Sequence, residues 1–170
     1  MYRQQLTFLP MDETSARAIQ AWRYEGAYQI YNMGTESDAP EVIAELLDRR
    51  SPYYAVYNEP GELLGFLNVG TSALVWGSTE PGIYLEDRCT ALGLGMRPDA
   101  TGKGAGLAFV QACLDFVRQE FAPVRIRLYV LAWNERAIRV YERAGFQRIR
   151  TFLQSNIHGE REFLEMSRDI

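Results

Sequence analysis

The feature that most constrains this chain is a glycine-rich loop, which joins an alternating apolar segment to an apolar helix within residues 92–121. Before the loop, glycine alternates with leucine or methionine up to Met96. This two-residue repeat predicts a strand on which one face carries only glycine and therefore no side chains. Pro98 ends that strand, because proline has no N–H group for the hydrogen-bond ladder. After the loop, apolar residues recur at helical spacing over a wide arc, which predicts a central helix packed on a sheet.

The three glycines of the loop, Gly102, Gly104 and Gly106, are expected to open this helix. At a helical position each glycine costs about 1 kcal/mol relative to alanine, so three together call for a reason. Glycine lets backbone N–H groups approach a ligand closely, and a helix N-terminus attracts negative charge. The loop therefore indicates an anion site, best suited to a pyrophosphate. An ordinary flexible connection between strand and helix is the alternative that glycines alone leave open.

Two common nucleotide-binding motifs do not fit this loop. The P-loop requires serine or threonine directly after Gly-Lys, but Gly104 follows Lys103 here. The dinucleotide-binding fingerprint requires a third glycine at the position that Leu107 occupies. A P-loop NTPase and a Rossmann dehydrogenase are therefore disfavoured.

Length and charge narrow the class of protein further. The 170 residues predict a single domain, residues 1–170, and the net charge of −4 argues against general binding to nucleic acid or to a membrane surface. The sequence has no apolar run near the ~20 residues of a spanning helix, and its first ten residues lack the core of a signal peptide. We therefore expect a cytoplasmic protein.

Cysteine and histidine content excludes several chemistries. Cys89 and Cys113 are widely spaced, which suggests neither a disulfide framework nor a zinc site, and we expect no metal. His158 is the only histidine, so Ser-His-Asp and Cys-His catalysis would have to depend on it alone.

The hydrophobic pattern predicts secondary structure in the order βααβββαβαββ, which is an α/β fold with a mixed sheet and helices on its faces. Besides the central helix, helices are expected from Asp12 or Thr14 to residue 22, over 41–49 and over 134–145. The predicted strands are 3–9, 53–57, 63–69, 83–96, 124–131, 146–153 and 162–167.

A second group of residues lies in the segment 128–146, which contains the pattern N-x-x-A-x-x-x-Y-x-x-x-G-F. Asn134 is placed to cap a helix, Tyr141 lies on the same helix face as Ala137, and Gly145 is placed to end the helix. Taken alone, the pattern favours a capped amphipathic helix whose tyrosine belongs to the core.

Together the two groups resemble the GCN5-related N-acetyltransferase (GNAT) superfamily over about the C-terminal half of the chain. The loop is similar to its Q/R-x-x-G-x-G/A acyl-CoA signature, with Gly104 and Gly106 matching and Thr101 at the Q/R position. Thr101 departs from the pattern, so one polar contact is expected to be weaker or replaced. The segment with Asn134 and Tyr141 follows the next strand, where this family places its second motif.

The resemblance implies a fold in which the strand ending at Met96 splays away from the strand ending near Ala132, with the pantetheine arm in the resulting cleft. It implies that the loop binds the pyrophosphate and that Lys103, Arg139 and Arg143 contact the 3′-phosphate, although a solvated basic face is the alternative for each of the three. The cofactor-binding residues that it implies are Leu94, Gly95, Met96, Thr101, Gly102, Lys103, Gly104, Ala105, Gly106 and Asn134.

The activity that the resemblance implies is transfer of an acetyl group from acetyl-CoA to a primary amine of a small molecule or a peptide. Tyr141 would protonate the leaving thiolate. The amine must lose a proton before it attacks, and Glu86 and Asp87 are the candidates for the base, with a surface role as the alternative for each. A non-catalytic acyl-CoA-binding module remains the second hypothesis.

The acceptor side is expected in the aromatic segment 22–33. Tyr24, Tyr28 and Tyr31 are the predicted substrate-binding residues. Core anchoring is the alternative for the whole segment, and it is somewhat more favoured for Trp22 than for the tyrosines. Two carboxylates near this segment, at positions 25 and 36, would attract a cationic amine. The sequence leaves open whether the chain forms a homodimer.

Overall fold

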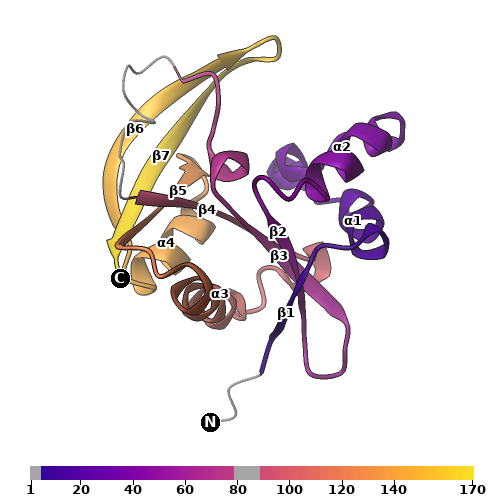
Figure 1. Cartoon of the computed structure of the whole chain (residues 1–170). Coiled ribbons are helices and arrows are strands. Elements are labelled where there is room, and N and C mark those ends of the chain that lie inside the picture. The colour runs from indigo at the N-terminus through magenta and orange to yellow at the C-terminus, as the bar shows by residue number, and fades with distance from the viewer. Residues whose placement is uncertain (1–4, 79–88) are drawn as a thin grey trace. The chain divides into compact units, whose positions relative to one another are not determined.

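The helices and strands follow the predicted order in the computed structural model, which describes residues 5–78 and 89–170 (Figure 1). The order βααβββαβαββ is therefore confirmed. The elements are β1 (Thr7–Pro10), α1 (Glu13–Gln20), α2 (Ala39–Leu46), β2 (Tyr53–Tyr57), β3 (Leu63–Val69), β4 (Cys89–Met96), α3 (Gly106–Phe121), β5 (Arg125–Leu131), α4 (Glu135–Arg143), β6 (Gln147–Asn156) and β7 (Gly159–Asp169).

Several boundaries differ from the sequence prediction. The two N-terminal helices end earlier than expected, at Gln20 and Leu46, and α2 begins two residues earlier, with a proline in its first turn. The β6–β7 hairpin is longer than expected, because its strands continue to Asn156 and from Gly159. Most of β6 is exposed, so its sequence lacks the apolar alternation that would have marked its full length.

The strands are hydrogen-bonded in the order β1-β2-β3-β4-β5-β7-β6, and contacts divide the chain into two units. The first unit contains Met1–Asn68 and Leu94–Lys103, and the second contains Val69–Gly93 and Gly104–Ile170. Strand β4 contributes residues to both units. Each unit is described in turn.

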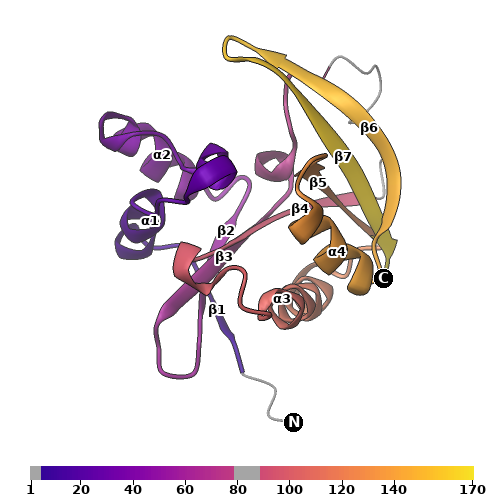
Figure 2. The ribbon, with the colours of Figure 1, turned by 180° about the vertical axis from the view of Figure 1, so that it is seen from behind.

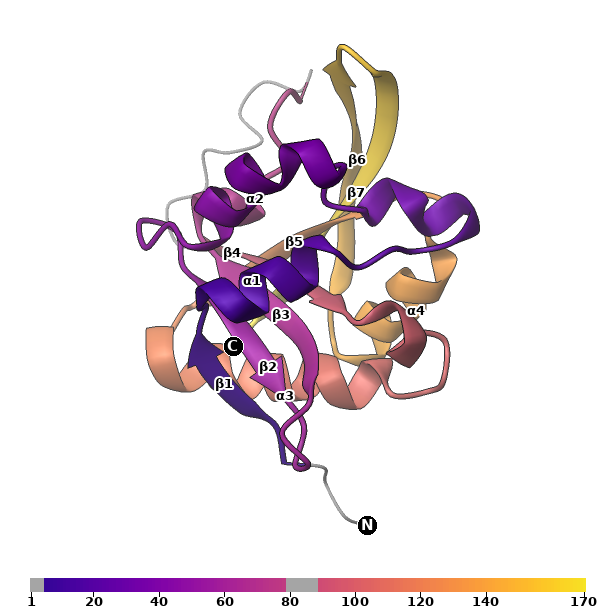
Figure 3. The same cartoon turned by 90° about the vertical axis from the view of Figure 1, so that its right-hand side faces the viewer.

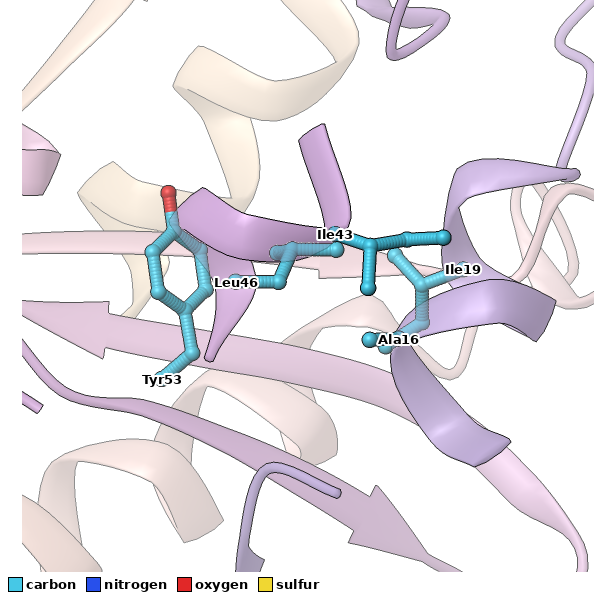
Figure 4. Packing of buried hydrophobic residues seen from close by; sticks show 5 residues of the cluster. All are labelled: Ala16, Ile19, Ile43, Leu46 and Tyr53. Carbon is cyan, nitrogen blue, oxygen red and sulfur yellow. The ribbon is translucent and has the colours of Figure 1, made fainter. Parts of the chain in front are cut away.

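In the first unit, β1, β2 and β3 pair in antiparallel fashion, and helices α1 and α2 pack on them (Figure 3). Asp12 caps α1, because its Oδ1 accepts the Ser15 N–H at 2.7 Å. Figure 4 shows the apolar side chains that these elements share, namely Ala16, Ile19, Ile43, Leu46 and Tyr53. The end of β4 belongs to this unit, where the Arg97 N–H donates to the Leu64 carbonyl at 2.7 Å.

Gly95 in β4 has a packing reason to be glycine. A Cβ atom at this position would lie 2.5 Å from Cε1 of Phe66. The Phe66 ring has aromatic neighbours of its own, with its centroid 6.4 Å from that of Trp22 and 6.2 Å from that of Tyr53. This part of the bare strand face is therefore filled by a side chain of the same unit.

The second unit contains the rest of the sheet and helices α3 and α4. The first residues of β4 pair in parallel with β5, from Cys89↔Arg125 to Ala91↔Arg127, and β5 pairs along its length with β7. Strands β6 and β7 form a long curved hairpin, with α3 and α4 on the same side of it in Figure 2. The buried side chains of these elements include Phe109, Leu114, Val117, Ile126, Leu128, Ile138, Leu164 and Met166.

We expect Gly95→Ala to destabilise the protein by about 1–3 kcal/mol, because the new methyl group overlaps the Phe66 ring. Phe66→Leu should lower stability by itself but relieve the added cost of the alanine. Urea unfolding of the two single variants and the double variant measures this coupling. Additive effects would contradict the packing explanation.

Candidate functional site

The glycine loop adopts a left-handed backbone before α3 begins. Gly102 has φ +70° and Gly104 has φ +80°, and α3 starts only at Gly106. The prediction that all three glycines open the helix was therefore wrong for the first two. Their backbone conformation strains any residue with a Cβ atom, so the loop geometry itself requires glycine at both positions.

The start of α3 has no side-chain cap. Its N-cap residue is Ala105, which has no acceptor to offer to the N–H groups of the first turn. A Cβ atom at Gly104 would meet nothing within 4 Å, whereas one at Gly106 would lie 3.4 Å from a methyl group of Val140 in α4. At the start of this 16-residue helix, the space beside Gly104 is open and the N–H groups of the first turn have no side-chain cap. This arrangement suits the binding of an anion.

Thr101, at the position where the acyl-CoA signature has Gln or Arg, is occupied within its own loop. Its Oγ1 donates to the Pro98 carbonyl at 2.7 Å. The preceding turn is held by an ion pair between Arg97 Nε and Asp99 Oδ1 at 2.6 Å, and this hydrogen bond lowers the pKa of the Asp99 carboxyl. Lys103 is exposed, so its ammonium group is available to a ligand phosphate.

The end of β4 carries Leu94, Gly95 and Met96, all of which are half-buried. In the described part of the chain, the parallel register with β5 covers Cys89 to Ala91, and β4 continues beyond it to Met96. The Met96 carbonyl accepts a hydrogen bond from the Tyr24 hydroxyl at 2.6 Å. Sequence reasoning missed this bond, because the two residues are 72 positions apart and no local pattern connects them.

The aromatic segment forms a small cluster of rings in the first unit. Tyr28 and Tyr31 belong to a 3₁₀ helix from Gly26 to Tyr31, and their rings stack at a centroid distance of 6.4 Å. The Tyr24 ring meets Tyr31 edge-on at 6.3 Å. Trp22 packs instead against the hydrophobic core of its unit, which agrees with the core-anchoring alternative considered for this residue. Glu25 is exposed beside the cluster.

Helix α4 places the residues of the second motif. Asn134 is buried, and its Oδ1 accepts the Ala137 N–H at 3.2 Å, so its predicted role as helix cap is confirmed. Tyr141 is half-buried and meets the Phe146 ring edge-on at a centroid distance of 6.0 Å. Arg139 and Arg143 are exposed on the same helix.

Glu86 and Asp87, the candidates for the base, lie outside the described residues. Within residues 5–78 and 89–170, no group of three His, Cys, Asp or Glu side chains is arranged to hold a metal ion. None of the helices in these ranges is long and apolar enough to cross a membrane.

A shallow cavity of about 430 Å³ lies in the first unit, at β1 and the turn between β2 and β3. Leu9, Tyr57 and Gly61 are among its lining residues. None of the predicted site residues lines it, so it gives no support to the site inferred from the sequence.

One protein family matches most of the chain, and curated proteins match parts of it. The acetyltransferase (GNAT) family matches residues 15–146. An aminoglycoside N(6′)-acetyltransferase type 1 from Klebsiella pneumoniae is 29% identical over 133 residues, which cover 76% of this chain and 63% of that protein. A mycothiol acetyltransferase from Propionibacterium freudenreichii is 45% identical over 58 residues, which cover 34% of this chain and only 18% of that protein.

Solved structures share the fold at low sequence identity. A chimeric spermidine N-acetyltransferase, derived in part from Vibrio cholerae, superposes with a TM-score of 0.72 at 17% identity and covers 97% of this chain and 95% of its own. A dodecameric spermidine N-acetyltransferase from Vibrio cholerae has a TM-score of 0.64 at 18% identity, with 97% and 94% covered. These likenesses confirm the predicted fold class.

The Tyr24 hydroxyl should make stability depend on alkaline pH. Burial raises its pKa from 10.0 to about 12, so the unfolded chain releases this proton at lower pH than the folded chain. The resulting stability is complete below pH 10 and is lost as the pH rises toward about 12. Tyr24→Phe should reduce this alkaline loss by about 1.4 kcal/mol between pH 8 and 11, as measured by urea unfolding, because that range covers one pH unit above the unfolded pKa. An equal loss in both proteins would contradict the assignment.

Proposed function

The chain belongs to the acetyltransferase (GNAT) family, and we propose that it transfers the acetyl group of acetyl-CoA to a primary amine by direct attack on the thioester. The observation that carries the proposal is the loop before α3, where two left-handed glycines lead into a helix start without a side-chain cap. Together with family membership, this loop supports binding of a pyrophosphate through backbone N–H groups.

The residues of the loop and of β4 fit the parts of acetyl-CoA. In the proposal, Gly102, Gly104, Ala105 and Gly106 bind the pyrophosphate. Thr101 shapes the loop rather than supplying a donor, because its hydroxyl and its backbone N–H both donate to the Pro98 carbonyl. Lys103 and the exposed arginines of α4 bind the 3′-phosphate. Backbone groups of Leu94, Gly95 and Met96 hold the pantetheine arm, which supplies the acetyl thioester. Asn134, at the N-terminus of α4, contacts the cofactor in this proposal.

The chemistry needs one group that removes a proton and one that returns it. A lysine-like amine has a pKa near 10.4, so its ammonium form must lose a proton before it can attack. We assign this step to Glu86 or Asp87. Tyr141 then donates its hydroxyl proton to the departing thiolate and regains a proton from the nitrogen, which loses its second proton as the amide forms. A backbone N–H at the end of β4 would polarise the thioester carbonyl.

The acceptor that we propose is a cationic amine that binds at Tyr24, Tyr28 and Tyr31. Tyrosine faces attract ammonium groups, and the exposed carboxylates of Glu25 and Glu36 add negative charge near this segment. Polyamines and aminosugars carry several such groups, and the names of the relatives above include spermidine and aminoglycoside acetyltransferases.

An amine panel tests the reaction. Purified protein is mixed with acetyl-CoA and a polyamine, an aminoglycoside, a lysine peptide or a neutral amino-acid ester, and release of free thiol is followed. We expect turnover with at least one multiply charged amine. Tight binding of acetyl-CoA without any amine-dependent thiol release would instead favour a non-catalytic acyl-CoA-binding module, which the inward-facing Thr101 hydroxyl also allows.

Gly104→Val should weaken acetyl-CoA binding at least tenfold, because the branched side chain would fill the open approach to the pyrophosphate. It should also cost at least about 1–2 kcal/mol of stability, because valine is strained at φ +80°. Calorimetric titration of the folded variant with acetyl-CoA measures the affinity.

Gly61→Val is the matched control for this backbone strain. Gly61 has φ +86° and likewise has nothing within 4 Å of an added Cβ atom, but it lies in the turn between β2 and β3. The control should lose similar stability and keep its acetyl-CoA affinity. If both variants bind acetyl-CoA as tightly as the unmodified protein does, the loop only connects β4 to α3 and does not bind the cofactor.

Tyr141→Phe should lower kcat roughly 10²-fold, at the bottom of the range for general acid catalysis. The thiolate has a pKa of about 8.5 by analogy with cysteine, so it already leaves fairly well and needs moderate help. Acetyl-CoA affinity should change little, because the ring and its contact with Phe146 remain. Single-turnover measurements avoid masking by product release. A chemical step at the unmodified rate would make Tyr141 a packing residue.

A further inference from the structure

We propose that the Tyr24 hydroxyl, apart from the contact of the Tyr24 ring with the amine, has a positioning role: its hydrogen bond to the Met96 carbonyl fixes the acceptor-side aromatic segment against the end of β4. The inference rests on the proposed function, because it assigns the amine to this segment and the thioester to the end of β4. All the residues that carry it belong to the first unit.

Three contacts hold Tyr24 in place. Its hydroxyl donates to the Met96 carbonyl at 2.6 Å, and its backbone N–H donates to Asn32 Oδ1 at 2.7 Å. Its ring meets Tyr31 edge-on at 6.3 Å. Asn32 immediately follows the 3₁₀ helix that carries Tyr28 and Tyr31, so it ties both ends of that helix together. The side chain of Tyr24 is therefore fixed at its base, its ring and its hydroxyl.

The acceptor of the hydroxyl is itself well positioned. Met96 is the last residue of β4, and the next N–H group, that of Arg97, donates to the Leu64 carbonyl at 2.7 Å. The strand end is thus anchored to β3 while its terminal carbonyl faces Tyr24. A carbonyl oxygen has two lone pairs, so Met96 can accept this bond and a pantetheine N–H together.

The segment has a separate anchor on its other side. The Gln20 amide donates to the carbonyls of Met33 at 3.2 Å and Thr35 at 2.9 Å. Those bonds attach the segment to α1, whereas the Tyr24 hydroxyl attaches it to the strand that would present the thioester. Loss of that hydroxyl should leave the segment folded but change its distance from the end of β4.

Misplacement of a reacting group by about 1 Å can cost on the order of 10²-fold in rate. The Tyr24→Phe variant should therefore lose about tenfold in kcat/KM for the amine, while its dissociation constant for acetyl-CoA stays within twofold. A general loss of structure would weaken both. The ratio between the two parameters separates positioning from simple destabilisation.

The experiment uses the full chain with acetyl-CoA and the best amine of the panel. Tyr57→Phe is the matched control, because the Tyr57 hydroxyl is also hydrogen-bonded within the first unit, to Ser15 of α1, but has no place in the proposed site. This control should lose stability without changing kcat/KM for the amine. Hydrogen exchange of residues 22–33 gives a readout without catalysis: these amides should exchange at least threefold faster in Tyr24→Phe and remain unchanged in Tyr57→Phe.

A pair of Asn32 variants tests the same link without touching Tyr24. Asn32→Ala removes the acceptor of the Tyr24 N–H and should reproduce part of the loss in kcat/KM for the amine. Asn32→Asp keeps an oxygen at that position and should restore most of it. This pair decides the matter if Tyr24→Phe does not fold.

The outcomes separate the inference from the function on which it rests. If the unmodified protein neither binds acetyl-CoA nor acetylates any amine, the proposed function fails, and unchanged hydrogen exchange in Tyr24→Phe would overturn the positioning role as well. If the unmodified protein is active and Tyr24→Phe keeps its kcat/KM for the amine, only the positioning role is overturned. Equal losses in amine and acetyl-CoA parameters would also overturn it.

Discussion

The left-handed backbone of the glycine loop is the constraint on which the candidate site depends. The chain must leave β4 at Met96 and enter α3 at Gly106, and it does so through positive φ angles at Gly102 and Gly104. A residue with a side chain would pay about 1–2 kcal/mol at each of these positions. The N-cap residue that follows, Ala105, has no side-chain acceptor, so the proposed anion site combines the turn of the loop with an uncapped first turn of α3.

The glycines of this region do not share one cause. Gly102 and Gly104 are required by their φ angles, whereas Gly95 is required because Phe66 occupies the place of its side chain. In the sequence all of them belong to one pattern, and a ligand could explain each. At Gly95 the position of Phe66 explains the glycine without a ligand. The argument for a ligand is strongest at Gly104, where an added Cβ atom would meet open space.

Patterns within a few residues of the sequence predicted those features of the fold that depend on interactions within a few residues. The order of helices and strands, the caps at Asp12 and Asn134, and the helix end at Gly145, with its φ of +93°, follow from period and capping chemistry within a few residues. The bond from Tyr24 to Met96 and the contact of Gly95 with Phe66 join distant parts of the chain, so no such pattern contains them. The chemical roles of Tyr141 and of the loop stay predictions.

The raised pKa of Tyr24 also restricts where a base for the reaction can be. Burial raises this pKa to about 12, so at neutral pH the phenol keeps its proton and acts as the donor to Met96. It cannot remove a proton from an ammonium group with a pKa near 10.4 while it holds its own. In the proposed mechanism the proton must therefore pass to a carboxylate such as Glu86 or Asp87, or to water. Tyr24 would then contribute to the rate by binding the amine with its ring and by positioning its segment through the bond to Met96, and not as a base.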